Sequence, residues 1–133
     1  MSDASLDHKL GPPRSLRSDE IEIITKLVRN TPFQEKILAA IGGTLVRDMP
    51  DGGMGSIKFR QKTAGEPIFG KQIAEGAFRD ADGVPVSITL NLDKSGDLFE
   101  LDVFKADGSP VVRYPDLADL EIIERHGNLG FPP

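Results

Sequence analysis

The sequence predicts an α+β fold in which an N-terminal helical hairpin packs on an antiparallel β-meander sheet. Three observations support this prediction. Apolar residues recur at helical spacing near the start of the 133-residue chain. From residue 44 onward they alternate with polar residues, as they do in strands. Asp-Gly and glycine-rich steps separate the alternating segments, which is typical of the short turns in an antiparallel sheet.

Length and composition indicate one globular domain. The 133 residues suit a single hydrophobic core, and 38% of them are hydrophobic. No apolar run is long enough to cross a bilayer, and residues 1–15 lack the layout of a signal peptide. We therefore expect a cytoplasmic protein that does not engage a membrane.

Charge and the absence of cysteine narrow the functional classes. Without cysteine the chain has no disulfide, no thiolate metal site and no cysteine nucleophile. A formal net charge of −5 argues against nucleic-acid binding by bulk charge. The same charge is compatible with a basic protein partner, and nothing in the composition excludes a homo-oligomer.

The helical hairpin is expected to follow an N-terminal arm. Residues 1–17 are predicted to form a flexible arm, because two prolines interrupt any helix there and the preceding residues are polar. A single α+β domain is expected over residues 18–133. Its first helix is expected to begin at Ser18, a favourable N-cap residue followed by two acidic residues. Apolar residues at helical spacing continue to Val28, and Asn30-Thr31-Pro32 ends the helix.

A second helix is expected over residues 33–41. Four apolar side chains share one face of it, at Phe33, Ile37, Leu38 and Ile41. Gly42-Gly43 then ends the helix. The two helices, separated by a short break, form the predicted hairpin.

The remainder of the chain has strand-like patterns. These are TLVRDM, SIKFRQK, VPVSITLNLD, DLFELDVFK and SPVVRYP, at residues 44–49, 56–62, 84–93, 97–105 and 109–115. The segment 68–80 is ambiguous, and its second half is expected to be a strand because the turn DADG follows it.

The register of the hairpin at residues 84–105 can be predicted from its apolar residues. A four-residue loop, DKSG, pairs Leu90 with Phe99 and Ile88 with Leu101, apolar with apolar. A three-residue loop sets Thr89 against Leu101 instead. We therefore predict the four-residue loop, with Ile88 and Leu101 side by side and buried against the helices.

The same register places Thr89 opposite Glu100 and Ser87 opposite Asp102. The outer face of the hairpin is therefore expected to be polar and acidic. Plain solvation accounts for such a face, because antiparallel sheets commonly leave one face wet. Binding of a basic partner is the functional alternative, and it makes Glu100 and Asp102 candidate binding residues.

The glycine-rich stretch DGGMGS, at residues 51–56, permits two interpretations. A phosphate-binding loop would lead into a helix or end in G-K-[ST], whereas a strand-like segment follows here. The favoured interpretation is a hairpin turn whose glycines adopt positive φ. The methionine then either covers the core edge or offers an apolar contact to a partner. The candidate binding residues of the loop are Asp51, Gly52, Gly53, Met54 and Gly55.

No metal, cofactor or catalytic set is indicated. The turns DADG and DKSGD lack the spacing of a calcium loop, and G-x-S-x-G does not occur. His126 is the one histidine expected in the folded domain, in a short C-terminal element. Glu100 and Asp102 lie two apart on one strand rather than across a cleft, so we expect a protein that is not an enzyme.

The stretches DGGMGS, DADGVPVSITLNLDKSGDLFELDVFK and SPVVRYP resemble a family of small bacterial proteins of uncharacterised function. The resemblance covers about residues 44–115, and the upstream stretch RSDEIEIITKLV fits it as well. It implies neither catalytic residues nor a cofactor. The end of the meander also loosely resembles bacterial immunity proteins, which neutralise toxins.

Together these observations predict a small acidic protein-binding module, of immunity or accessory type, in a bacterial cytoplasm. The alternative is a small-molecule-binding or hydrolytic domain that uses the DGGMGS loop as a pocket wall. The two differ around Met54, because a pocket wall requires a concave cavity with convergent polar groups, whereas a contact loop requires only an exposed rim.

Overall fold

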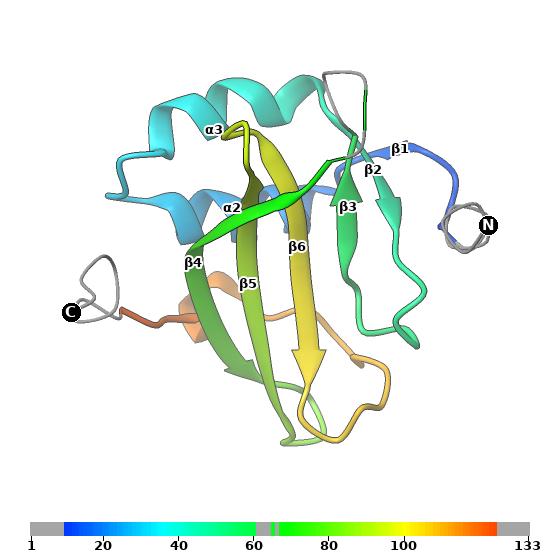
Figure 1. Ribbon diagram of the computed structural model, residues 1–133. Coiled ribbons are helices and arrows are strands. Elements are labelled where there is room, and N and C mark those ends of the chain that lie inside the picture. The colour runs from blue at the N-terminus through cyan, green and yellow to red at the C-terminus, as the bar shows by residue number, and fades with distance from the viewer. Residues whose placement is uncertain (1–9, 61–64, 66, 125–133) are drawn as a thin grey trace.

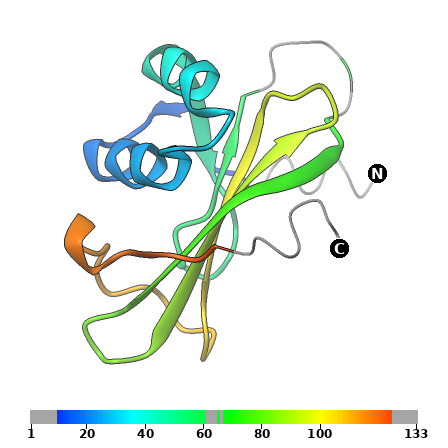
Figure 2. The ribbon, with the colours of Figure 1, turned by 90° about the vertical axis from the view of Figure 1, so that its left-hand side faces the viewer.

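The computed structural model describes residues 10–60, 65 and 67–124. Within these residues the chain forms two α-helices and a seven-stranded antiparallel sheet, an α+β fold in which the sheet dominates. Both helices lie on one side of the sheet (Figure 1, Figure 2). Neither helix in this part of the chain has the length and apolar character that a membrane crossing requires. The element expected around His126 lies outside the described residues.

The strands are β1 (Arg14–Ser15), β2 (Leu45–Asp48), β3 (Ile57–Phe59), β4 (Phe69–Arg79), β5 (Pro85–Asp93), β6 (Leu98–Lys105) and β7 (Glu121–Ile122). The helices are α2 (Ser18–Val28) and α3 (Gln34–Ala40), with 3₁₀ turns η1 (Ile41–Gly43) and η2 (Leu117–Asp119). The sheet order is β1-β2-β3-β6-β5-β4-β7. Strands β4, β5 and β6 form the predicted meander, but β3 pairs with β6 rather than with the next strand in the chain.

The predicted arm joins the domain earlier than expected. Arg14–Ser15 pairs with β2, and the side chain of Leu16 is buried. The backbone N–H of Gly11 donates to the carbonyl of Asp48 at 2.9 Å. The boundary predicted at residue 17 is therefore too late. Residues 1–9 lie outside the described residues.

Helix α2 begins with Ser18 as its first helical residue rather than as its cap. Arg17 is the N-cap residue, and its backbone N–H donates to the Glu20 carboxylate at 2.8 Å. The apolar face of α2 is buried in the core. Just after the helix, Asn30 takes a positive φ of 66°. This left-handed residue turns the chain toward α3, close to the predicted break.

The predicted register of the β5–β6 hairpin is wrong by two residues. Leu90 pairs with Leu101 and Ile88 pairs with Val103. The loop has three residues, because the N–H of Asp93 donates to the carbonyl of Asp97 at 2.8 Å. A bulge next to Asn91 then adds one more residue on β6 and restores the match of apolar with apolar.

The extra residue of the bulge is Phe99. Its ring lies outside the core cluster and meets the ring of Phe69 edge to face at 6.4 Å. The alternation predicts that Phe99 and Leu101 share the core face. The bulge turns Phe99 away from it, so this prediction is wrong. Ile88 and Leu101 are both fully buried, in a cluster that also contains Ile23 of α2.

Two further segments differ from expectation. Nearly all of the ambiguous segment 68–80 is strand, as β4 (Phe69–Arg79), with two irregularities in its register. The expected strand at 109–115 is irregular, because its backbone N–H groups are taken by other acceptors. The N–H of Val112 donates to the Asp80 carboxylate at 2.7 Å, and that of Val111 donates to the carbonyl of Gly53 at 3.1 Å.

Candidate functional site

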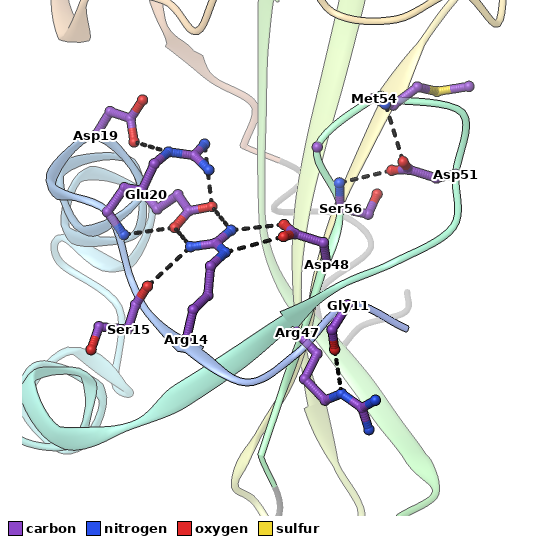
Figure 3. A network of polar contacts seen from close by, with 12 residues as sticks. Gly11, Arg14, Ser15, Asp19, Glu20, Arg47, Asp48, Asp51, Met54 and Ser56 are labelled. Atoms are coloured by element: carbon purple, nitrogen blue, oxygen red, sulfur yellow. Dashed lines mark hydrogen bonds and ion pairs between the residues drawn. The ribbon is translucent and has the colours of Figure 1, made fainter. Parts of the chain in front are cut away.

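The DGGMGS loop is a tight connection between β2 and β3, as predicted. Gly52, Gly53 and Gly55 have φ values of 76°, 86° and 104°. The Asp51 carboxylate accepts the backbone N–H groups of Met54 and Ser56 at 3.1 and 2.8 Å (Figure 3). The loop is therefore closed on itself by its own aspartate, and its glycines supply a backbone that other residues rarely adopt.

The loop also covers an open edge of β6. The β3–β6 pairing ends at Leu101, and two loop side chains continue it. The Ser56 hydroxyl accepts the N–H of Val103 at 2.8 Å and donates to its carbonyl at 3.2 Å. The Met54 sulfur accepts the N–H of Lys105 at 3.4 Å. Half-buried Met54 is thus an edge cover, rather than the free apolar contact that the sequence left open.

The second half of the candidate site lies on the outer face of the sheet, which we define as the face opposite the helices. Figure 1 looks onto this face, with α2 behind the strands. A row of directly paired residues crosses it from β2 to β4: Arg47, Lys58, Glu100, Asn91 and Gln72. The row is basic on β2 and β3, acidic on β6 and neutral beyond.

The predicted neighbours of the two carboxylates need correction, because the register is shifted. Thr89 faces Asp102 rather than Glu100, and Ser87 faces Phe104 rather than Asp102. The face is also not uniformly acidic, since Lys58 is the direct β3 neighbour of Glu100.

Glu100 and Asp102 act as a coupled pair. Burial, followed by the charge of Asp102, raises the pKa of Glu100 to about 7, and the charge of Lys58 opposes this rise. Burial also raises the pKa of Asp102, which accepts a hydrogen bond from the Asn91 amide at 2.9 Å. The contact between the two carboxyl groups favours the neutral form of Glu100, so the pair takes up its first proton more readily than an isolated carboxyl group does.

The sequence interpretation missed the other members of this face. Lys58 lies with its ammonium 5.6 Å from the ring centre of Phe99, and Phe104 is 58% exposed. The alternation in SIKFRQK does place Lys58 opposite to the core residues Ile57 and Phe59. The signal that β3 lies beside β6 was absent, however, because it depends on a long-range pairing. The DGGMGS loop acts on the same pair through Asp51, whose charge raises the pKa of Asp102.

Two other charged networks are structural. Arg14 donates to both oxygens of the fully buried Glu20 at 2.9 and 2.8 Å, and it also pairs with Asp48 at 2.8 Å (Figure 3). These contacts fasten β1 to α2 and β2. Because every group in this network has an opposite charge beside it, the network needs no external ligand.

The second network surrounds Lys105 at the end of β6. Its ammonium contacts Asp80 at 2.8 Å and Asp82 at 2.6 Å, and it donates to the Pro110 carbonyl at 3.1 Å. Burial alone would raise the pKa of Asp80, but Lys105 and three backbone N–H groups hold it well below its usual range. Among the residues that the structure describes, no group of three or more His, Cys, Asp or Glu side chains could hold a metal ion.

A shallow depression of about 380 Å³ lies beside the end of β4. It is lined by Arg79, Ala81, Arg113, Tyr114, Pro115, Asp116 and Asp119. The DGGMGS loop supplies none of these lining residues. It supports one of them, because the Tyr114 hydroxyl donates to the Gly55 carbonyl at 3.0 Å.

Comparison with known proteins adds a family but no activity. No curated protein and no solved structure matches the chain. A family model described as a domain of unknown function matches residues 13–115. The match begins upstream of the motifs at 44–115 and runs from β1 through β6. The chain therefore belongs to the family of the domain of unknown function DUF6984.

Proposed function

We propose that this protein is a non-enzymatic binding module that engages another polypeptide through the outer face of its sheet. The observation that carries the proposal is the Glu100–Asp102 pair, two half-buried carboxyl groups side by side on β6, neither of which forms a salt bridge among the described residues. A polypeptide with basic groups would neutralise them. Phe104, two residues beyond Asp102, would supply an apolar contact beside the charges.

The charge distribution favours a partner that is basic where it meets β6. Acidic groups steer such a partner during diffusion, so they act more on the association rate than on the final affinity. The loose resemblance to immunity proteins supports one concrete version, in which the module neutralises a toxin or serves as an accessory protein in a bacterial cytoplasm. The DGGMGS loop would contribute through Asp51, which lies close enough to influence Asp102.

The test is retention of protein from native cell extract by the immobilised chain. We compare wild type with the Glu100→Lys/Asp102→Lys variant. The matched control is Glu22→Lys/Glu35→Lys, which changes the net charge equally at two exposed residues on the helices. A retained protein should associate about tenfold more slowly with the outer-face variant, with a weaker dependence on salt, and normally with the control.

If both variants retain the same amount of the partner, the partner binds another face and the proposed surface is refuted. Retention of no protein by wild type at low salt would remove the binding-module proposal altogether. In that event, saturable binding of a small metabolite would favour the second candidate.

The second candidate is a small-molecule-binding or hydrolytic domain. The observation that favours it is the depression lined by Arg79, Arg113 and Tyr114, which combines two guanidinium groups with a phenol. In this version the DGGMGS loop is a support behind the pocket wall. Binding that is lost in Arg113→Ala, and kept in the outer-face variant, would identify this site.

A further inference from the structure

We infer that a second copy of this chain is a partner of the outer face, with Lys58 of each copy paired to Glu100 of the other about a two-fold axis. The inference rests on the proposed function, because it names a partner for the same surface. It starts from the order of charges in the row across the sheet. Lys58 on β3 and Glu100 on β6 are direct neighbours, so opposite charges stand side by side at one level.

The two charges attract each other, since the charge of Lys58 lowers the pKa of Glu100, but they form no salt bridge. Among the described residues no ion pair joins Lys58 to Glu100, and the Lys58 ammonium lies over the Phe99 ring instead. Glu100 has Asp102 as its carboxyl neighbour. The face therefore presents a cation beside an acidic pair, and among the described residues neither is held in a salt bridge, so each can accept an opposite charge from a partner.

A simple symmetry operation supplies both. Two copies packed face to face can be related by a two-fold axis that runs along the strands, between β3 and β6. Because the operation exchanges the positions of β3 and β6, it sets Lys58 of one copy opposite Glu100 of the other, twice. Lys58 and Glu100 are direct partners across β3 and β6, so an axis along the strands keeps them at the same level. Adjacent strands are about 4.8 Å apart, which brings the groups of the two copies within reach of one another.

The same axis gives the interface an apolar centre. Phe104 lies on β6 and points to the outer face with 58% of its surface exposed. The axis brings the two Phe104 rings to either side of it, about one strand spacing apart. An exposed aromatic side chain flanked by complementary charges is the usual composition of a binding hot spot.

Sedimentation velocity on the purified chain, from about 1 µM to 1 mM, measures the dimer directly. Lys58→Glu and Glu100→Lys should each weaken self-association at least tenfold, because each sets like charges together twice. Glu35→Lys, on the helical side, should leave self-association unchanged. An equimolar mixture of Lys58→Glu and Glu100→Lys should form a heterodimer, since both intermolecular pairs are then restored.

The mixture distinguishes an intermolecular pair from a structural one, because a purely local role of either residue is not repaired by a second chain. If either reversal fails to fold, Lys58→Gln and Glu100→Gln replace them, and each should still weaken the dimer severalfold. A chain that stays monomeric throughout, or a mixture that does not associate, overturns the inference. If such a monomer still retains an extract protein through Glu100 and Asp102, the proposed function stands while this inference fails.

Discussion

The backbone N–H of Lys105 donates to the sulfur of Met54, 51 residues earlier in the chain, at 3.4 Å. The side chain of the same lysine is buried against Asp80 of the β4–β5 turn, at 2.8 Å. Asp80 in turn accepts the N–H of Val112 in the segment after β6. Lys105 and Asp80 thus join the DGGMGS, DADG and SPVVRYP stretches at one end of the sheet. Local architecture therefore accounts for the motifs on which the family resemblance depends.

The contact between Met54 and Lys105 predicts a local effect of Met54→Leu. Leucine keeps the volume but offers no acceptor, so the Lys105 N–H loses its partner. We expect a loss of about 1 kcal/mol in unfolding free energy and faster hydrogen exchange at the Lys105 amide. Met49→Leu, the same change in the same connection, is the control. Equal protection of that amide in the two variants would contradict an edge-covering role for the sulfur.

The Lys105–Asp80 pair predicts strong non-additivity. Asp80→Ala leaves the Lys105 ammonium buried beside Asp82 alone and frees the N–H groups of Val112 and Arg113. We expect Tm to fall by about 10 °C, with exchange rising first in residues 106–115. Lys105→Met/Asp80→Ala should lose less than the sum of the single variants, because no unpaired buried charge remains.

Asp82→Ala is the control for this pair, since Asp82 contacts the same ammonium but its side chain is 42% exposed. Its Tm should change by no more than about 3 °C. A similar fall for Asp82→Ala and Asp80→Ala would show that burial of the pair is not what stabilises this end of the sheet.

The close approach of Tyr114 to Gly55 predicts that a larger residue at position 55 destabilises the fold. A Cβ at Gly55 would lie 2.6 Å from the Tyr114 hydroxyl oxygen, and φ there is +104°. Gly52 has φ +76° with nothing within 4 Å of a Cβ. We expect Gly52→Ala to cost about 1 kcal/mol and Gly55→Ala about 2–4 kcal/mol by chemical denaturation.

Tyr114→Phe separates the two causes of the Gly55 effect. In that background the hydroxyl is absent, so the difference between Gly55→Ala and Gly52→Ala should shrink. An unchanged difference would mean that backbone conformation, rather than the close approach of Tyr114, sets the cost.

The sequence predicts the fold class well because its signals are local. Helical spacing locates α2 and α3, and alternation locates β2, β3, β5 and β6. The hairpin register fails for a physical reason: the three-residue loop and the bulge at Phe99 each shift the pairing by one residue. Two shifts restore the match of apolar faces, so the apolar pattern alone does not distinguish them from the predicted loop.

The candidate site is predictable only in part, for a related reason. Glu100 and Asp102 are recognisable from alternation along a single strand. Their neighbour Lys58 comes from β3, and the β3–β6 pairing joins strands that are not consecutive in the chain. The apolar pattern says which side of a strand faces the core, but it does not say which strands lie beside each other.

The raised pKa of Glu100 predicts that the free energy of unfolding depends on pH between 4.5 and about 7. Its pKa rises from 4.5 in the unfolded chain to about 7 in the folded one, through burial and the neighbouring Asp102. Between these values the folded state binds more protons than the unfolded state, so its contribution to stability falls as pH rises. Since Glu100 is only half-buried, we discount the shift for solvent screening and expect a change of about 1 kcal/mol.

Glu100→Gln isolates this contribution, because glutamine is neutral at every pH and has nearly the same shape as glutamate. Urea denaturation at pH 4.5 to 8, at a concentration where the chain is monomeric, should give similar stabilities for both proteins at the acid end. At pH 8 the variant should be the more stable by about 1 kcal/mol. Glu22→Gln, at an exposed residue of α2, should run parallel to wild type throughout. A parallel curve for Glu100→Gln would instead mean that Glu100 ionises in the folded protein as it does in the unfolded chain, and that the pair on the outer face is fully solvated.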